Sequence, residues 1–554
     1  MRKAISVWMV MALLLSVLGC NQSGSVSKED SKRVPDSSTV AQKEDSSEAD
    51  VQGFTYPFPA NADGSHVTVS MNKNDFVRAD VPSYTVIDGK SYYFWDVLEE
   101  KTGIHIDFIG SESNAQSTSE AANLLIVSGE FPDIWRVNWI NHPGGPTGAM
   151  TDGIILNLSE NAEFCPNLMA YAQANADINK MIVNDDGDLY CFPFIIDCPG
   201  IGYVGTGPVI RSDWLEEQNM KTPVTIEDWT TALRVFKDQY NCTSGLSFES
   251  RWLWLDYAAA SLTSAWQTAF PFYIMDGTVK FGPLEEGYRG FVQQMADWYA
   301  EGLLDPDFAS VDKSTVQAKF ANSESGITIQ QDSNVENGLL ANKGTGFMAA
   351  PLPVPVLKEG DPQMFGHLVP KYDGRFSLSV APGKNQEAAM RLCDYMYSEE
   401  GQMLCAYGTE GITYTTDQNG EFAGFTDIIT NNSQTEEAPS SIRSQFALWN
   451  NWASPQRDAS IFKSDFIKGL VSVWRENDME KHYYPAVTHT PEEVSLISEV
   501  YGDIETYCKE SIIQFILGTQ SMDSWDAFTE RLKTLGMDAV ISAKQEAYNR
   551  FNAR

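Results

Sequence analysis

The sequence has few basic residues for its length. Of its 554 residues, 39 are Lys or Arg and 75 are Asp or Glu, so the formal net charge at pH 7 is −36. A protein that binds nucleic acid needs an excess of basic side chains to neutralise phosphates. The composition therefore excludes nucleic acid as the expected partner, fits a soluble extracellular protein, and mildly disfavours a strongly anionic ligand.

The sequence also lacks the common metal and catalytic motifs, because it contains no CxxC, HExxH or GxSxG. Residues 200–205 match GxGxxG literally, but a proline and a strand-like run follow where a dinucleotide site needs a helix. Residues 184–190 (NDDGDLY) lack the spaced ligands of a calcium loop and predict a hairpin turn. We expect no cofactor, no metal and no enzymatic activity. A glycosidase pair of carboxylates cannot be recognised from sequence and stays open.

Long apolar runs are scarce, and the one at the N-terminus is short. Residues 4–19 are mostly apolar and follow two basic residues. This is the pattern of a secretory signal peptide, and it is shorter than the roughly 20 residues of a membrane span. Val17-Leu18-Gly19-Cys20 resembles the bacterial lipobox. We expect residues 1–19 to be a lipoprotein signal peptide and Cys20 to be lipidated, with a plain secreted protein or an uncleaved anchor as the alternatives.

A polar segment follows the leader. Residues 21–50 contain eight serines and almost no large apolar side chains, so they cannot bury enough surface to offset the entropy of ordering. We expect residues 20–65 to be a disordered tether, of which thirty residues reach roughly 30 Å. Lipidation of Cys20 leaves seven cysteines, an odd number that forbids complete internal pairing. We expect most of these to be small buried apolar residues.

Strand and helix patterns alternate in the first part of the folded chain, which predicts a parallel α/β sheet. The predicted order is strand 66–71, helix 92–103, strand 104–110, helix 121–127 and strand 131–137. Further along, an apolar face from Tyr288 to Tyr299 predicts a helix that Gly302 ends, and a capping box at 490–493 opens a long helix reaching Phe515.

Five segments, in this order, resemble the sugar-binding extracellular solute-binding lipoproteins of ABC importers, in their long Gram-positive branch. Together they are spread over nearly all of residues 66–554. The segments are EAANLLIVSGEFPDIW (120–135), VIRSDWLEEQNMKTPVTIEDW (209–229), WYAEGLLDPDF (298–308), EAAMRLCDYMYSEEGQMLCAYGTEGITYT (387–415) and YYPAVTHTPEEVSLISEVYGDIETY (483–507).

The resemblance implies an α/β, two-lobed periplasmic-binding-protein fold with a hinge, in which each lobe is a doubly wound sheet. The expected first lobe comprises residues 66–195 and 365–415. The expected second lobe comprises residues 196–364 and 416–554, including the C-terminal helices. Ligands of open α/β sheets bind outside the carboxyl ends of the strands, which places the site in the cleft between the lobes.

A sugar site needs aromatic platforms for flat C–H faces and polar groups for hydroxyls. Such residues follow several predicted strands, although each could instead pack in a core or lie on a surface loop. Arg211 and Asp213, near a predicted helix start, are interpreted as structural. The expected ligand-binding residues are Asn138, Trp139, Asn141, Trp254, Trp266, Gln331, Asp332 and Trp449.

The resemblance predicts a membrane-anchored receptor on the extracellular face, not an enzyme, that captures an oligosaccharide and delivers it to the permease subunits of an ABC importer. Three alternatives stay open at this point. They are a receptor for another solute such as a peptide, a surface carbohydrate-active enzyme, and a sensor that presents ligand to a membrane kinase.

Overall fold

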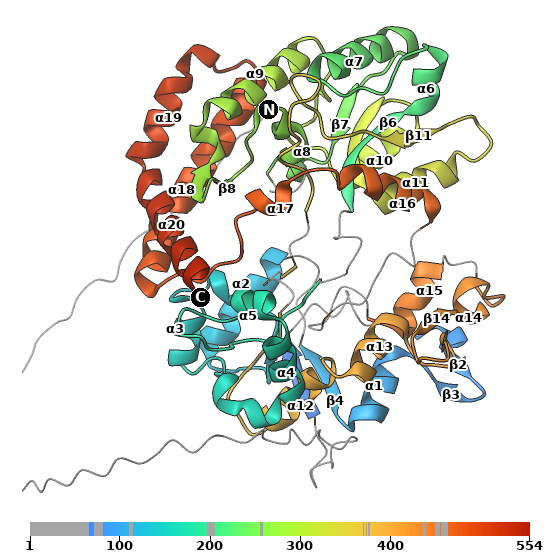
Figure 1. Cartoon of the computed structure of the whole chain (residues 1–554), viewed down its shortest axis with the longest axis vertical. Coiled ribbons are helices and arrows are strands. Elements are labelled where there is room, and N and C mark those ends of the chain that lie inside the picture. Colours follow the sequence, from blue (N-terminus) through green and yellow to red (C-terminus); the bar gives the residue numbers. More distant parts are fainter. Residues whose placement is uncertain are drawn as a thin grey trace, which may run out of the picture. The chain divides into compact units, whose positions relative to one another are not determined.

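The computed structural model describes residues 66–70, 81–109, 115–196, 205–254, 259–368, 371–372, 374, 377–435, 439–448, 455 and 464–554. The predicted signal peptide, Cys20 and the predicted tether lie outside these residues. The described residues form two four-stranded mixed sheets, each with its own helices (Figure 1).

The first sheet has the strand order β12, β5, β1, β4. β1 pairs in parallel with both β4 and β5, and β12 pairs antiparallel with β5. The predicted parallel α/β arrangement is confirmed, with one antiparallel strand added at an edge. The strands are β1 (His66–Ser70), β4 (His105–Ile109), β5 (Ile134–Trp135) and β12 (Ser379–Val380).

Helices follow these strands where the sequence predicts them. The first of these helices, α1, is closed by Gly103, which adopts the left-handed conformation (φ 72°) that glycine tolerates best. Residues buried on its inner face join those of β1 and β5 in one core. The helices of this part of the chain are α1 (Phe94–Thr102), α2 (Ala115–Ser128), α3 (Gly145–Thr151), α4 (Pro166–Ala174), α5 (Ala176–Ile182), α12 (Gln386–Tyr395) and α13 (Glu399–Tyr407).

The second sheet has the order β11, β6, β10, β7, and is antiparallel except for the parallel pair of β10 with β7. Its strands are β6 (Thr206–Arg211), β7 (Leu246–Phe248), β10 (Ile327–Gln331) and β11 (Ala349–Pro351). The helices that pack around it include α6 (Ser212–Glu217), α7 (Ile226–Tyr240), α8 (Ala259–Thr263), α9 (Glu286–Ala300), α10 (Lys313–Ala321) and α11 (Asp332–Ala341), with the hairpin β8 (Phe272–Met275) and β9 (Thr278–Phe281) beside them.

A distant helix returns to this sheet. α16 (Asp465–Trp474) lies against β6, and the Trp474 indole N–H donates to the Pro208 carbonyl at 3.0 Å. A Cβ at Gly207 would lie 2.4 Å from the Trp474 ring. Only a glycine at this position lets the ring lie flat on the strand.

The C-terminal helices are α18 (Pro491–Ile516), α19 (Trp525–Thr534) and α20 (Met537–Ala553). The predicted capping box is present, with Thr490 and Glu493 each bonding the other's backbone N–H. α18 packs against α9 and α20 (Figure 1), and its apolar face belongs to the second-sheet core. α18 also contacts α3, which belongs to the first-sheet part of the chain. These helices therefore touch both parts.

Residues just beyond the predicted boundary at 415 pack with the first-sheet part. α15 (Pro439–Phe446) places Ile442 and Phe446 in a cluster with Tyr84, and Arg443 donates to the Ala406 carbonyl of α13 at 3.2 Å. The hairpin β13 (Tyr414–Thr416) and β14 (Phe422–Phe425) packs on α13 as well. These contacts favour a boundary further along the chain, and the lobe limits themselves stay a prediction.

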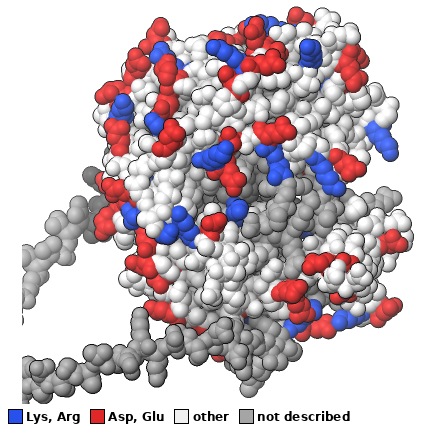
Figure 2. Space-filling model, in the orientation of Figure 1, with Lys and Arg blue, Asp and Glu red and all other residues white. Residues whose placement is uncertain are grey.

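The described cysteines are small buried residues, as predicted. Cys165, Cys191, Cys242, Cys393, Cys405 and Cys508 are all buried and form no disulfide with one another, whereas Cys198 lies outside the described residues. Among the helices that the structure describes, none has an apolar stretch long enough to cross a bilayer. On the face in Figure 2, acidic and basic side chains are interspersed over the described surface, without a continuous basic area of the kind that binds nucleic acid.

A network of charges ties the C-terminal helices to the predicted turn at 184–190, which the structure confirms as a hairpin turn closed by the Val183 and Leu189 bridge. The Asp185 carboxylate accepts from Arg550 at 2.7 Å, from Thr488 at 2.9 Å and from Arg554. Arg550 also binds the buried Glu493 at 2.8 Å. The turn thereby becomes a docking point for α18 and α20.

Replacing Asp185 by Asn is expected to lower the free energy of unfolding by about 2 kcal/mol at pH 7, because it removes charge-assisted hydrogen bonds. Partial burial raises the pKa of the Asp185 carboxyl, and the bonds from Arg550, Thr488 and Arg554 more than reverse this, so its net pKa lies below the ordinary 3.8. A lowered pKa stabilises the fold above the ordinary value, and that contribution is lost as the pH falls through the folded-state pKa.

The difference between wild type and Asp185→Asn, measured by urea unfolding, should therefore be full at pH 7 and shrink below about pH 4. The matched control is Asp186→Asn, one residue along the same turn, where the exposed side chain makes no ion pair among the described residues. A control variant as destabilised as Asp185→Asn would contradict the role given to the network.

Candidate functional site

Parallel pairing brings the carboxyl ends of strands to one edge of each sheet. In the first sheet these ends are Ser70, Ile109 and Trp135, and in the second sheet β7 and β10 end at Phe248 and Gln331. We call these the first and second carboxyl edges. Ligands of open α/β sheets bind outside such edges. Among the predicted site residues that the structure describes, Gln331 ends β10 and Asp332 follows it, whereas Trp266 is further from any strand end. The others come within six residues of the end of β5 or β7, and they are Asn138, Trp139, Asn141 and Trp254.

Trp139 is on the first carboxyl edge, in the 3-10 helix η3 (Trp139–Asn141) that follows β5, and only 1% of it is exposed. Its ring lies edge-on to Trp135 at 5.9 Å and to His142 at 5.1 Å between centroids. Burial lowers the pKa of His142, which keeps this neighbour neutral at pH 7. The Trp139 indole N–H has no hydrogen-bond partner within the described residues. Ligand contact by Trp139 stays a prediction.

The two predicted asparagines flank this tryptophan. Asn138 caps η3, with its side-chain oxygen accepting from the Ile140 N–H at 3.3 Å, and is partly exposed. The same oxygen would lie 2.7 Å from a Cβ at Gly374, so another segment of the first-sheet part closes over it. Asn141 is the last residue of η3. The structure therefore brings all three predicted residues together at one edge.

The second carboxyl edge contains Gln331 at the end of β10 and Asp332 at the start of α11, both partly exposed. Lys313 donates to the Gln331 side chain at 3.3 Å. The neighbouring Gln330 is 4% exposed, and its amide NH2 donates to Thr328, while its Oε1 atom has no partner among the described residues. Sequence reasoning missed Gln330, because strand alternation alone gives no sign that an inward glutamine is left unpaired.

The predicted tryptophans of the second-sheet part differ in their surroundings. Trp254 follows the 3-10 helix η5 (Ser250–Leu253) after β7, is partly exposed, and lies edge-on to Phe270 at 5.5 Å. Because η5 is helical, Trp252 and Trp254 do not share a strand face, and Trp252 is buried. Trp266 packs on α9, where a Cβ at Gly290 would lie 2.5 Å from its ring. That contact is typical of a packing residue. Trp449 lies outside the described residues.

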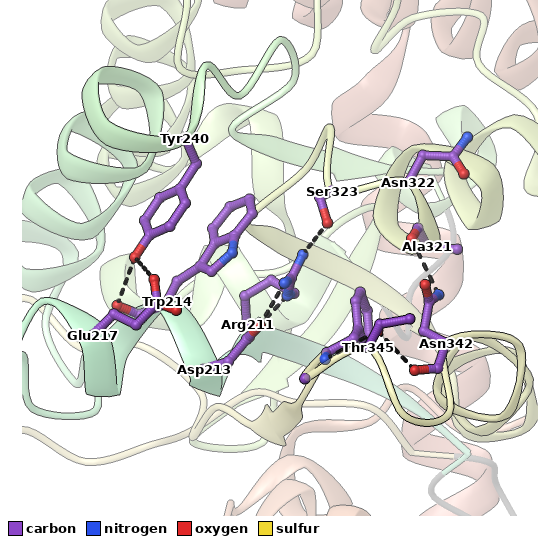
Figure 3. Close-up of a pocket in the computed structure, with 12 residues that line it drawn as sticks. Arg211, Asp213, Trp214, Glu217, Tyr240, Ala321, Asn322, Ser323, Asn342 and Thr345 are labelled. Atoms are coloured by element: carbon purple, nitrogen blue, oxygen red, sulfur yellow. Dashed lines mark hydrogen bonds and ion pairs between the residues drawn. The ribbon is translucent and has the colours of Figure 1, made fainter.

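A cavity of about 490 Å³ lies at the other end of the second sheet (Figure 3). The Arg211 guanidinium is held between two rings, 4.3 Å from the centroid of Trp214 and 4.2 Å from that of Phe347. It donates to Asp213 at 2.9 Å and to the Ser323 hydroxyl at 2.5 Å. The guanidinium is therefore both hydrogen-bonded and stacked, with 4% of Arg211 exposed.

The contacts around this cavity are those of a structural centre. Trp214 stacks on Tyr240 with centroids 4.2 Å apart, and the Tyr240 hydroxyl donates to Glu217 at 2.8 Å. Polar groups that already bond one another gain little from a ligand. β6 runs antiparallel to β10, so Arg211 at the end of β6 lies beside the start of β10, where its N–H donates to the Gly326 carbonyl at 3.0 Å, whereas Gln331 pairs with Thr206 at the far end of β6. The structure supports the structural interpretation of Arg211 and Asp213, and the carboxyl edges remain the candidate site.

Residues 86–403 match the model of the family described as bacterial extracellular solute-binding protein. Two curated relatives resemble most of the chain. The fructooligosaccharide ABC transporter substrate-binding protein FusA of Streptococcus pneumoniae is 21% identical over 493 residues, covering 82% of this chain and 86% of FusA. The polygalacturonan/rhamnogalacturonan-binding protein YtcQ of Bacillus subtilis is 23% identical over 446 residues, covering 77% of this chain and 82% of YtcQ.

Solved structures with the same fold include the alginate-binding protein AlgQ2, with a TM-score of 0.69 and 21% identity, covering 88% of this chain and 98% of AlgQ2. FusA of S. pneumoniae in complex with kestose also has a TM-score of 0.69, with 19% identity, covering 88% of this chain and 100% of FusA.

Replacing Arg211 by Met should lower the free energy of unfolding by about 3 kcal/mol, because it leaves the largely buried Asp213 carboxylate without its cation. The matched control is Arg234→Met. Arg234 pairs with Glu301 at 2.7 Å, but that pair is exposed to solvent and should contribute far less to stability. Equal changes in the two variants, measured by urea unfolding, would show that the Arg211 centre does not stabilise the fold.

Proposed function

Because the chain belongs to the bacterial extracellular solute-binding protein family, we propose that it captures an oligosaccharide between the two lobes of its fold and delivers it to an ABC importer. The names of its relatives support the ligand class, since FusA is named for fructooligosaccharides and YtcQ for polygalacturonan and rhamnogalacturonan. These names, together with the polar and aromatic groups at the carboxyl edges of this chain, favour an oligosaccharide as its ligand.

The observation that carries the proposal is a pair of buried polar atoms, one near each carboxyl edge, that have no hydrogen-bond partner among the described residues. Trp139 offers a buried N–H donor after β5, and Gln330 offers a buried amide oxygen near the end of β10. A buried polar group without a partner costs about 1–3 kcal/mol. Sugar hydroxyls both donate and accept hydrogen bonds, so one ligand that reaches both edges satisfies both atoms.

Partly exposed groups at the same edges complete the proposed site. Asn138 extends the first edge, while Gln331, Asp332 and Trp254 extend the second. Asn141, the last residue of η3, remains a predicted member of the first edge. Amides and carboxylates bind hydroxyls, and the indole of Trp254 offers a platform for a sugar face. Trp266 and Trp449 remain predicted members of the site.

Binding favours closure of the two lobes about a hinge, because only the closed state lets one ligand contact both edges. The permease subunits then recognise the surface of the closed, ligand-bound receptor and distinguish it from the surface of the empty receptor. We further propose that Cys20 carries a lipid anchor and that residues 20–65 tether the folded part near the outer face of the membrane. The lipoprotein LipO of Bacillus subtilis, 22% identical over 478 residues, supports this placement.

A thermal-shift panel tests the ligand class directly. The full chain is heated with fructo-, galacto-, malto- and uronic-acid oligosaccharides, with tri- to pentapeptides as the control class. At least one oligosaccharide should raise the melting temperature, since a ligand at 100 times its Kd stabilises the folded state by about 2.7 kcal/mol. The bound sugar should be recovered intact by mass spectrometry. A shift with peptides alone, or cleavage of the sugar, contradicts the proposal.

Replacing Trp139 by Phe should weaken binding of that oligosaccharide about tenfold, because it removes the N–H donor and keeps the ring. The matched control is Trp135→Phe, four residues earlier. The Trp135 N–H already donates to the Ile154 carbonyl at 3.2 Å, so its loss should lower stability and leave affinity unchanged. Calorimetric titration measures both variants. Equal affinities of Trp139→Phe and wild type would remove Trp139 from the site.

A further inference from the structure

Two histidines lie side by side at the amino edge of the first sheet, opposite the carboxyl edge. His66 is the first residue of β1 and His105 the first residue of β4, and the parallel register makes them direct neighbours. Their ring centroids are 4.8 Å apart. Asp107 lies two residues after His105 on the same face of the strand. Backbone pairing thus places two imidazoles and a carboxylate at one spot.

The distances in this cluster match those of a metal site. His66 Nδ1 is 3.1 Å from Asp107 Oδ2, and His105 Nε2 is 3.6 Å from Asp107 Oδ1. Ligand atoms that surround Zn²⁺ tetrahedrally at 2.0–2.1 Å lie about 3.3 Å from one another. One potential ligand atom from each of the three residues lies within 4.8 Å of the others. Small side-chain rotations therefore suffice to coordinate one ion.

A second carboxylate orients one of the imidazoles. His105 Nδ1 is 2.7 Å from Glu99 Oε2 at the end of α1. If Nδ1 carries the proton and donates it to Glu99, the lone pair of Nε2 is free and faces Asp107. This carboxylate–histidine arrangement fixes the tautomer of zinc ligands and raises their basicity.

The local charge also favours a cation. Within the described residues, the ion-pair partners of Asp107 are His66 and His105, and that of Glu99 is His105. Neither carboxylate is paired with Lys or Arg there.

We propose that His66, His105 and Asp107 bind one late first-row divalent metal ion, with Zn²⁺ as the reference ion and Glu99 as the residue that positions His105. Two imidazoles and one carboxylate suit Zn²⁺ and its neighbours, whereas Ca²⁺ and Mg²⁺ prefer sites made of oxygen atoms. The bound ion would join β1 to β4 at the first of the described strands. This departs from the sequence prediction that the protein holds no metal.

The test is calorimetric titration of the full chain, stripped with EDTA and dialysed, with ZnCl2 at pH 7.5. One equivalent should bind in a step distinct from weak binding to surface carboxylates, and X-ray absorption at the zinc edge should report two imidazoles at about 2.0–2.1 Å. CaCl2 in excess should not displace the ion. Zn²⁺ should also raise the melting temperature, since it binds the folded state.

His66→Asn and His105→Asn should each weaken this step by at least about tenfold, while Glu99→Gln should weaken it less, because it alters only the orientation of His105. The matched control is His482→Asn. His482 lies outside the cluster, and its Nδ1 atom is 2.9 Å from the Ile274 carbonyl oxygen. This variant should bind Zn²⁺ as the wild type does. No stoichiometric step, or a step that survives both cluster variants, overturns the proposal. Oligosaccharide binding plays no part in this assay, so its outcome is independent of the proposed transport function.

Discussion

The parallel pairing of β1 with β4 and β5, and of β10 with β7, is the constraint on which the other features depend. Parallel strands share a direction, so each sheet has one edge of strand starts and one of strand ends. Trp139, Gln331 and the segment leading to Trp254 follow strand ends, whereas His66 and His105 are strand starts. A five-residue strand separates these edges by about 13 Å. One rule of backbone geometry thus supplies both the proposed sugar site and the proposed metal site, and keeps them apart.

Closure of two lobes requires parts that are each rigid and joined by few contacts. Each sheet has its own large core, and the Arg211 centre stabilises the second one by stacking and charge. The C-terminal helices contribute Ile504, Ile512 and Phe515 to the second core, but also reach Asp185 on the first-sheet part through Arg550 and Arg554. The same helices also meet this part through apolar residues, because Met181 of α5 packs against Ala547 and Phe551 of α20.

The sequence predicts the local elements well and the site only in outline. Alternation in 66–70, the glycine at 103 and the capping box at 490–493 depend on neighbouring residues, and all appear where predicted. The surroundings of an aromatic side chain depend on residues distant in the sequence: Trp266 packs on a glycine of α9, and Trp139 is buried in one cluster with Trp135 and Tyr190. The sequence could not reveal that the Gln330 Oε1 atom is buried without a partner among the described residues, because burial depends on the packing of distant segments. Nor could it reveal that His66 and His105 are neighbours, because that depends on the register between β1 and β4.

The central claim is that the ligand binds at both carboxyl edges together. Hydrogen–deuterium exchange of the full chain, with and without a bound oligosaccharide, tests it most directly because it reports every peptide at once. We predict slower exchange in residues 136–142 and in residues 249–254 and 330–333, with no change around Arg211 or at His66 and His105. Protection confined to one edge, or centred on the Arg211 cavity, would contradict the account.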